Sequence, residues 1–293
     1  MKLALGAAGA ALAADSLLWE PYHPQVTRIE TELRNLPEAF DGFTIAQLSD
    51  FHYEPYFGAA QIRAGVEVAN RLSPDLVVLT GDFVTVPFVK SRGRRRRAAA
   101  MAEPCAELLA SLKARCGSYA VLGNHDVSSD ADMVTEALEQ RGIPVLSNRA
   151  VPITQQGARF WLAGVNDVME RRADLDTAMR DVDRREPVVL LAHEPDFADL
   201  AALHNVDLQL SGHSHGGQIR LPFLVPAYLP PLARKYPWGI RRIGGLILYT
   251  NAGVGTIHVP MRWNCPAEVT LIILRKGGQQ QGERSRPPSI QIG

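Results

Sequence analysis

Aspartates, an asparagine and histidines are concentrated in five short motifs of this 293-residue sequence. Each motif follows an apolar run with the composition of a buried β-strand. Strand ends that meet at one rim would bring carboxylate, amide and imidazole donors together. Such mixed donors favour Mn²⁺, Fe or Zn²⁺ over Mg²⁺, which prefers oxygen ligands and water. The motifs are Asp50-Phe-His52, Gly81-Asp82, Gly123-Asn-His-Asp126, His193 and Gly212-His-Ser-His215.

The motifs contain enough candidate ligands for two divalent metal ions that share one ligand. We expect Mn²⁺, with Fe or Zn²⁺ as alternatives. Five of the eight histidines fall in the motifs, a placement that scattered core or surface histidines would not show. The candidate ligands are Asp50, His52, Asp82, Asn124, His193, His213 and His215.

Strands and helices alternate along the segments that must position these motifs. The strand-like run Phe43–Leu48, a helical pattern over 59–72 and the run Leu76–Thr80 predict a β-α-β unit with parallel strands. Two strand-like segments around Gln156-Gly157 predict a hairpin in a second sheet. Helices are also expected over 102–115 and 131–140. The pattern predicts an α/β sandwich with its site at the carboxyl ends of the strands.

Composition bounds the class of protein. The chain is 46% hydrophobic and 21% charged, as expected of a globular protein with one main domain, here over residues 26–275. Lys+Arg and Asp+Glu both number 31, so no overall field favours a nucleic-acid partner. The three cysteines cannot all pair within the chain, and we interpret them as free thiols.

The two ends of the chain differ from its middle. Residues 1–15 resemble an export signal or the remnant of a membrane anchor, with a frayed helix as the alternative. If this segment is a truncated signal, the protein is exported or membrane-associated in the cell envelope; otherwise it is cytoplasmic. The polar tail over 276–293 is expected to be disordered.

Two further segments permit more than one interpretation. The arginine run 92–97 is a solvated loop, the start of the next helix, or a surface that attracts phosphate or anionic head groups. The long proline- and aromatic-rich connection 218–242 is either a lid over the metal site, with an apolar face for a lipid, or a surface loop that covers a sheet edge.

The five motifs, in this order, resemble the calcineurin-like metallophosphoesterases. That resemblance implies a four-layer αββα sandwich of two mixed sheets, with a dinuclear metal site at the strand C-terminal ends. It further implies that Asp82 bridges the two ions. The first ion would be held by Asp50, His52, Asp82 and His215, and the second by Asp82, Asn124, His193 and His213.

The resemblance also implies hydrolysis of a phosphoester or pyrophosphate by a hydroxide that bridges the ions. His125 would donate a proton to the leaving oxygen and Asp126 would orient it. Arg220 and Arg262 are candidate substrate-binding residues. The chain looks most similar to the exported or membrane-associated bacterial branch, which resembles enzymes that cleave UDP-2,3-diacylglucosamine.

The expected substrate is therefore a phosphorylated small molecule or a lipid-linked or nucleotide-lipid compound. The protein is expected to be a monomer with peripheral membrane contact. One alternative is a nucleotide or nucleic-acid phosphodiesterase, although no stable nucleic-acid partner is expected. The alternative of another class is a non-catalytic scaffold stabilised by metal. His125 argues against a scaffold, because a scaffold has no need of a proton donor beside its ligands.

Overall fold

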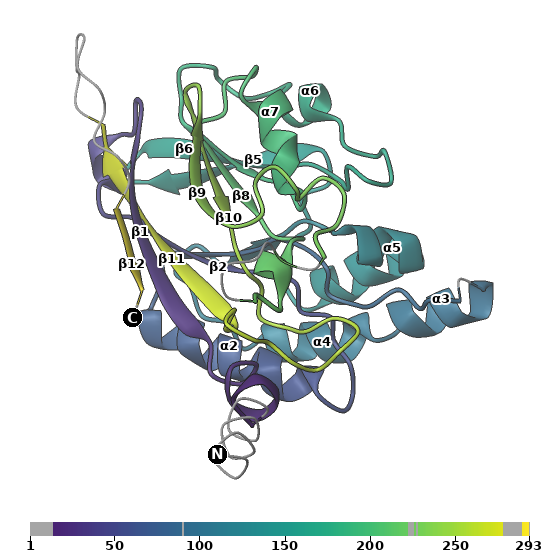
Figure 1. Ribbon diagram of the computed structural model, residues 1–293. Helices are drawn as coiled ribbons and strands as arrows, with labels where there is room; N and C mark the ends of the chain where they lie inside the picture. The colour runs from purple at the N-terminus through teal and green to yellow at the C-terminus, as the bar shows by residue number, and fades with distance from the viewer. Residues whose placement is uncertain (1–13, 90, 222–225, 227, 278–288, 293) are drawn as a thin grey trace, which may run out of the picture.

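The computed structural model describes residues 14–89, 91–221, 226, 228–277 and 289–292, and it forms two packed β-sheets enclosed by helices (Figure 1). The strand order is β12-β1-β11-β2-β3-β4 in the first sheet and β5-β6-β7-β8-β10-β9 in the second. Each sheet contains both parallel and antiparallel pairs. The expected sandwich of two mixed sheets flanked by helices is confirmed.

The strands of the first sheet are β1 (Gln25–Leu33), β2 (Thr44–Leu48), β3 (Leu76–Leu79), β4 (Ser118–Ala120), β11 (Glu268–Lys276) and β12 (Ser289–Ile292). Those of the second are β5 (Arg149–Gln155), β6 (Ala158–Gly164), β7 (Val188–Leu191), β8 (Leu208–Ser211), β9 (Gly239–Ile243) and β10 (Leu246–Thr250).

The α-helices are α2 (Gly58–Leu72), α3 (Arg92–Ala99), α4 (Ala102–Leu109), α5 (Asn124–Gln140), α6 (Leu175–Ala178) and α7 (Ala198–Ala201). Short helices of other types are η1 (Asp15–Trp19), η2 (Glu38–Phe40), η3 (Pro195–Phe197) and η4 (His215–Gly217).

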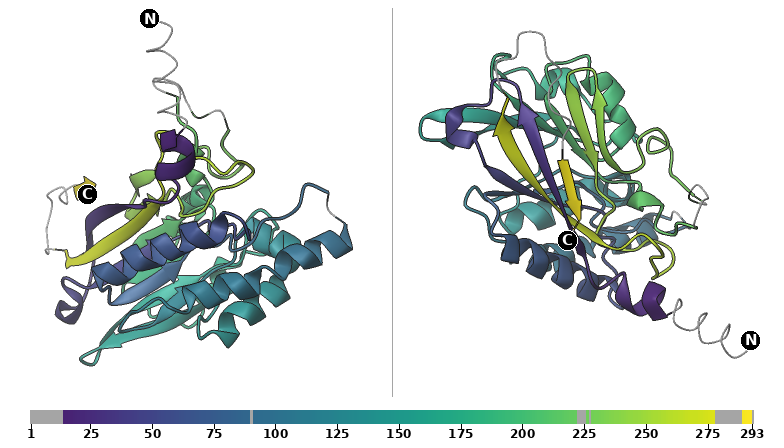
Figure 2. Two further views of the ribbon diagram at one scale, coloured as in Figure 1. Left: turned by 90° about the horizontal axis from the view of Figure 1, so that it is seen from below. Right: turned by 60° about the vertical axis from the view of Figure 1, so that its left-hand side comes forward.

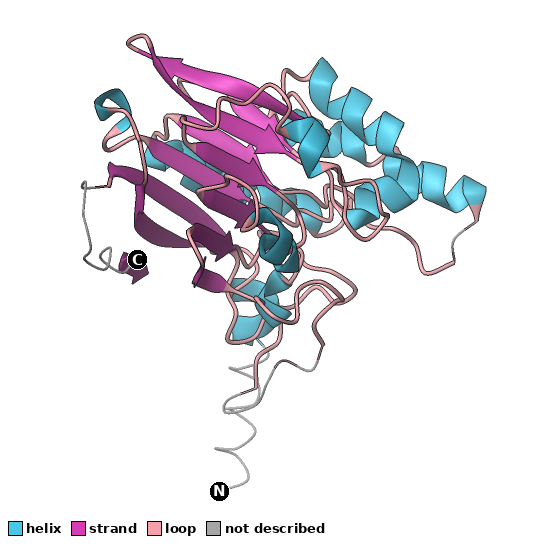
Figure 3. Ribbon diagram, turned by 90° about the horizontal axis from the view of Figure 1, so that it is seen from above, coloured by secondary structure: helices cyan, strands magenta, loops and turns pink. Residues whose placement is uncertain are grey.

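Three apolar clusters hold the layers together. One lies between the first sheet and helices α2, α4 and α5, as Ile62 and Leu138 illustrate. A second fills the space between the two sheets and includes Phe160. The third lies between the second sheet and α6 and α7. Figure 1 shows α2 and α4 on the side of the first sheet and α6 and α7 on the side of the second, and Figure 3 shows the strands stacked between them.

Parallel pairing brings the motif-bearing strand ends to one rim. In the first sheet, β2 pairs in parallel with β3, and β3 with β4. In the second sheet, β7 pairs in parallel with β8. Because the carboxyl ends of parallel strands meet at the same edge of a sheet, the five motifs leave the sandwich on one side.

Several element boundaries differ from the expectations. The arginine run forms a helix of its own, α3, and the helix expected over 102–115 ends at Leu109. Helix α5 begins at Asn124, inside a motif, and Asp130 interrupts it with extended backbone. The expected hairpin is confirmed as β5 and β6.

The two termini differ from each other in how far they are described, and the C-terminal one contains an additional strand. The tail was expected to be disordered, which is wrong for Ser289–Ile292, because these residues pair with β1 as strand β12. The expected export signal falls largely on residues 1–13, which lie outside the described residues. Within the part of the chain that the structure describes, no helix is both long enough and apolar enough to cross a membrane.

Truncating an aromatic side chain between the sheets should destabilise the fold. Phe40, Phe43 and Phe160 are buried and meet edge to face, with ring centroids 5.0–5.5 Å apart. Phe160→Ala should therefore lower the free energy of unfolding in urea by about 3–5 kcal/mol. Phe88→Ala, at a side chain that is 85% exposed, should change it by less than about 0.5 kcal/mol. Equal losses for the two variants would contradict this account of the core.

Candidate metal centre

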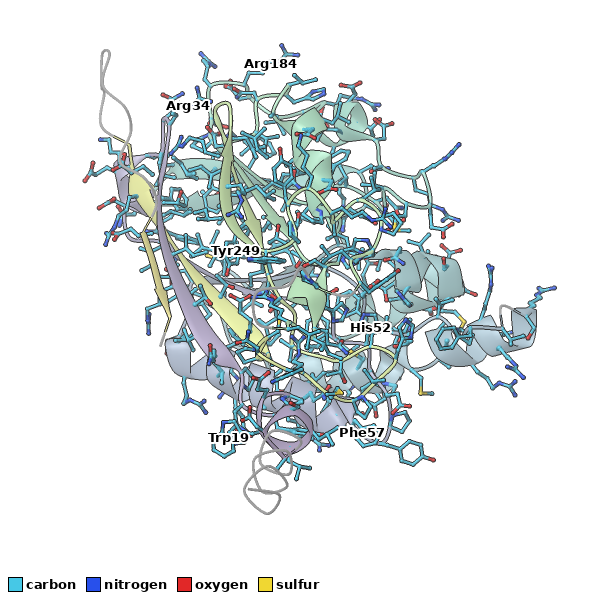
Figure 4. The ribbon with its side chains drawn as sticks, viewed as in Figure 1. Trp19, Arg34, His52, Phe57, Arg184 and Tyr249 are labelled. Atoms are coloured by element: carbon cyan, nitrogen blue, oxygen red, sulfur yellow. The ribbon has the colours of Figure 1, made fainter. Side chains whose placement is uncertain are left out.

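The candidate ligands converge into two buried groups at the rim. One group contains Asp50, His52 and His215, and the other contains Asp82, His193 and His213; in each, one ligand atom per residue lies within 4.8 Å of the others. Figure 4 places His52 among the loops at this side of the molecule. The grouping agrees with the assignment implied by the motifs.

Asp82 connects the two groups through a single carboxylate oxygen. Its Oδ2 lies 3.5 Å from His52 Nε2 and 3.2 Å from His193 Nε2. Its Oδ1 accepts a hydrogen bond of 2.9 Å from the backbone N–H of His125. An oxygen that faces both groups at once has the position required of a bridging ligand.

Backbone carbonyls fix which nitrogen of two imidazoles faces the cluster. His193 Nδ1 donates to the carbonyl of Thr80 at 2.6 Å, and His213 Nε2 donates to the carbonyl of Pro231 at 2.9 Å. Since a carbonyl only accepts, the opposite nitrogen of each ring faces the cluster and is the atom that can bind a metal. Such hydrogen bonds orient histidines for metal binding. The sequence motifs gave no signal for these two carbonyls.

The ligand-bearing backbone leaves the strands in left-handed turns. Values of φ are positive at Asp50 (54°), His52 (42°), Asp82 (57°), His213 (68°) and His215 (50°). Asp50 and His52 therefore reach the same ligand group through these turns, because the chain is no longer extended there. Non-glycine residues in this region cost on the order of 1–3 kcal/mol each, and such strain is typical of functional sites.

The motif glycines allow the loops to approach one another. A Cβ at Gly123 would lie 2.3 Å from Asp82 Oδ1. A Cβ at Gly81, where φ is 97°, would lie 2.6 Å from His193 Nδ1. No side chain fits at either place, so glycine is required for the two sheets to share one cluster.

The donor set fits divalent cations. The buried Oδ1 of Asn124 has no hydrogen-bond partner among the described residues, and the Nε2 atoms of His52 and His215 face each other at 2.9 Å. Burial lowers the pKa of His52 to about 3 and that of His213 to about 4, so both rings are neutral and can bind metal. These features favour borderline ions such as Mn²⁺, Fe or Zn²⁺.

His193 carries a proton that a metal would displace. Burial lowers its pKa, but the nearby carboxylates of Asp82, Asp50 and Glu194 together outweigh burial and hold the pKa well above its usual value. The pKa of Asp82 is raised by burial and lowered more strongly by His193 and His125, so it stays well below its usual value. Without metal, the imidazolium of His193 balances the Asp82 carboxylate.

His125 and Asp126 lie beside the cluster, and the Asp126 carboxylate holds the backbone of two loops. The backbone N–H of Val86 donates to His125 Nδ1 at 2.9 Å, so the ring carries its proton on Nε2. The Asp126 carboxylate binds loop backbone and thereby ties the Gly-Asp loop to the Gly-Asn-His-Asp loop. It accepts hydrogen bonds from the N–H groups of Asp82, Phe83, Val84 and Gly123.

The two arginines expected to bind substrate lie outside the cavity beside the metal groups. Arg262 is fully buried, and its guanidinium donates to backbone carbonyls of the loop after β10. Arg220 donates to the Gly216 carbonyl and stacks over Trp238 at 4.4 Å, beside a different cavity. Both guanidinium groups are thus used to hold loops, which the sequence did not reveal.

A cavity of about 290 Å³ opens at the metal groups. Asp82, Asn124, His125, His213 and His215 form its polar end. Its other walls are mainly apolar, and they include part of the connection 218–242. The apolar lining residues are Met169, Ile219, Tyr228, Pro230, Pro231, Ile257 and Val259. His258 also lines the cavity, and no motif in the sequence indicated it.

Comparison with known proteins assigns the family. The model of the calcineurin-like phosphoesterases matches residues 43–217, more than half of the chain and the whole of the five motifs. The chain belongs to the calcineurin-like phosphoesterase family. The family and the two ligand groups together make it a metallophosphoesterase with a dinuclear divalent-metal site, as the motifs predicted.

Relatives in this family come from bacteria and animals. The chain is 31% identical to the uncharacterized metallophosphoesterase YkuE of Bacillus subtilis, with 87% of each chain covered. It is 29% identical to phosphodiesterase YaeI of Escherichia coli over 79% of this chain and 82% of the relative. It is 31% identical to a transmembrane protein with a metallophosphoesterase domain from Danio rerio; 91% of this chain and 61% of that protein are covered.

Replacing Asp126 by asparagine should loosen this phosphoesterase site without removing a candidate ligand. The amide nitrogen cannot accept, so two of the four backbone N–H groups would lose their partner. Asp126→Asn should lower the free energy of unfolding by about 2 kcal/mol or more and weaken Mn²⁺ binding. Asp174→Asn, at the exposed cap of α6, is the matched control and should change neither property. An unchanged unfolding midpoint for Asp126→Asn would contradict the anchoring role.

Metal binding should release protons at neutral pH, because the protonated His193 must become neutral before it can ligate. Isothermal titration calorimetry with Mn²⁺ in buffers of different ionisation enthalpy should therefore show net proton release. Affinity should fall as the pH is lowered, since acid favours the metal-free, protonated form. Binding without proton release would mean that His193 is already neutral or does not ligate.

Proposed function

We propose that this metallophosphoesterase hydrolyses a phosphodiester or pyrophosphate bond in a substrate that carries an apolar group. The observation that carries the proposal is the composition of the cavity, which has candidate metal ligands at one end and apolar walls elsewhere. A phosphoryl group would lie at the polar end. A hydrocarbon or other apolar group would lie along Ile219, Tyr228, Ile257 and Val259, where burial of its surface favours binding.

In this proposal the two ligand groups hold two divalent ions, for which we propose Mn²⁺. Asp50, His52 and His215 hold the first, and Asn124, His193 and His213 hold the second. Asp82 serves both. When bound, the ions supply Lewis-acid stabilisation of phosphoryl charge and make water more acidic. The rings of His193 and His213 are already oriented for this, because the carbonyls of Thr80 and Pro231 hold them.

We assign His125 the task of stabilising the leaving oxygen. Its ring lines the cavity and carries its proton on Nε2, since Nδ1 accepts from the Val86 N–H. A neutral ring in this state donates a hydrogen bond to an oxygen that gains negative charge. Donation of a full proton would leave an anionic ring, so we favour hydrogen-bond donation over the proton transfer that the motif suggested.

The lipid-linked substrate and the membrane setting remain part of this proposal. A pyrophosphate between a nucleotide and an acylated sugar, as cleaved by the enzymes that the sequence resembles, has the required combination of phosphate and apolar chains. The main alternative is a nucleotide or nucleic-acid phosphodiesterase, which the name of the Escherichia coli relative permits. The apolar walls favour the lipid over a strand of nucleic acid, which would need stacking and basic side chains.

A substrate comparison tests the proposal. The protein is stripped of metal with a chelator and reloaded with Mn²⁺. Activity should vanish and return, and kcat/KM should be higher for bis(p-nitrophenyl) phosphate than for the p-nitrophenyl monoester. Among pyrophosphates, one that carries acyl chains should have a lower KM than one without, and Ile257→Asp should remove that difference. A preference for the monoester, or indifference to acyl chains, would exclude the proposed substrate class.

His125→Ala should slow the reaction without loss of metal. Removing a hydrogen-bond donor to the leaving oxygen should lower kcat about 10²–10³-fold, while metal analysis should still find the same number of ions per chain as in the wild type. His204→Ala is the matched control, because His204 lies at an exposed ion pair with Asp176 and should leave kcat unchanged. Unchanged turnover by His125→Ala would remove the assigned role.

A further inference from the structure

Large apolar side chains that remain exposed are concentrated at the side of the molecule where the cavity opens. Among the described residues, all of these except Leu200 and Leu203 come from segments around the metal site. Phe88 is 85% exposed and Tyr56 is 84% exposed. Leaving aside Met169, which lines the cavity itself, we call the following set the apolar rim: Leu17, Leu18, Trp19, Tyr56, Phe57, Phe88, Val89, Leu221, Tyr228 and Val259.

One loop, residues 253–263, connects the segments of the apolar rim. Its His258 stacks on Phe88 with ring centroids 4.8 Å apart. Its Thr256 accepts a hydrogen bond from Gln61 of α2, the helix that begins directly after Tyr56 and Phe57. Its Arg262 donates its N–H to the carbonyl of Ser16, next to Leu17 and Trp19. The exposed side chains therefore surround a single area, and Figure 4 shows Trp19 and Phe57 on the same lower edge.

A basic helix adjoins the apolar rim. Helix α3 begins at Arg92, soon after Phe88 and Val89 in the sequence, and contains five arginines in six positions, 92 and 94–97. Among the described residues, none of these arginines forms an ion pair. Figure 2 (left) shows α3, the loop 253–263 and η1 along one side of the molecule. This side thus combines unpaired positive charge with protruding apolar side chains.

We propose that the apolar rim and helix α3 form a docking surface for an anionic lipid bilayer. The apolar side chains would enter the boundary between head groups and acyl chains, where tryptophan and tyrosine are favourable. The arginines would bind lipid phosphates, each worth about 1 kcal/mol near a charged surface. The cavity between them would then open toward the lipid.

The shape and charge of the surface favour a bilayer over a protein partner. The apolar side chains protrude separately from five loops and helices, whereas a protein interface needs one closely packed patch. The chain that leads into η1, residues 3–13, consists only of Leu, Ala and Gly. Apolar insertion together with a basic cluster supplies the two signals that stable membrane attachment requires. This docking does not depend on the proposed reaction.

Vesicle flotation with the full chain tests the proposal. Vesicles of phosphatidylcholine with about 30% phosphatidylglycerol should bind the protein, and pure phosphatidylcholine vesicles should bind it on the order of tenfold less. Binding should weaken as salt rises. The double variants Tyr56→Ser/Phe88→Ser and Arg94→Glu/Arg97→Glu should each bind anionic vesicles on the order of tenfold less than the wild type.

Two matched controls separate docking from general effects. Leu200→Ser/Leu203→Ser removes exposed apolar side chains elsewhere, and Arg184→Glu/Arg242→Glu reverses exposed arginines elsewhere; both should bind as the wild type does. Hydrolysis of soluble bis(p-nitrophenyl) phosphate and the melting temperature should be the same in all four variants, which shows intact folding whatever the natural substrate is. Equal loss in control and rim variants would overturn the proposal. Absence of vesicle binding, with or without self-association through the rim, would also overturn it.

Discussion

The structure depends on one carboxylate oxygen that is shared by two groups of imidazoles. Asp82 follows a strand of the first sheet, and the nearest imidazole of its own group, His193, follows a strand of the second. Neither sheet alone could assemble the site. The apolar layer between the sheets, which includes Phe40 and Phe160, therefore has a functional consequence, because it sets the distance across which the oxygen must reach.

Local backbone strain at the site is offset by hydrogen bonds between the motifs. The left-handed residues Asp50 and Asp82 would relax toward extended backbone if they were free. The Asp50 carboxylate is held by the His213 N–H at 3.0 Å, and the loop after Asp82 is held by Asp126. These bonds cross between motifs, so each loop fixes the conformation of the next. Metal ligands positioned in this way need little rearrangement when an ion binds.

The sequence predicted the candidate metal ligands better than it predicted the residues that hold those ligands in place. The five motifs follow parallel strands, and residue type and strand order were enough to place the candidate ligands together. The roles of Asp126 and Arg262 were not predictable, because both bind backbone groups whose positions have no signature in the sequence. The same holds for the carbonyl of Pro231, which reaches His213 from a segment expected only to be a lid or a surface loop. The strand β12 was not predicted, because it is only four residues long and follows a polar segment whose composition is typical of disorder.

The loop 253–263 links catalysis to the surface of the molecule. At its start, Gly255 donates its N–H to the carbonyl of Asp50, beside the first ligand group. At its middle, Ile257 and Val259 form cavity wall, and His258 carries the stacked Phe88. At its end, Arg262 donates to the carbonyls of Gly253 and Gly255 in the same loop and closes it into a compact unit. The same loop therefore contacts both the apolar rim and the first ligand group. If the rim docks on a bilayer as proposed, a lipid substrate would enter the cavity from the bilayer without first passing into bulk water.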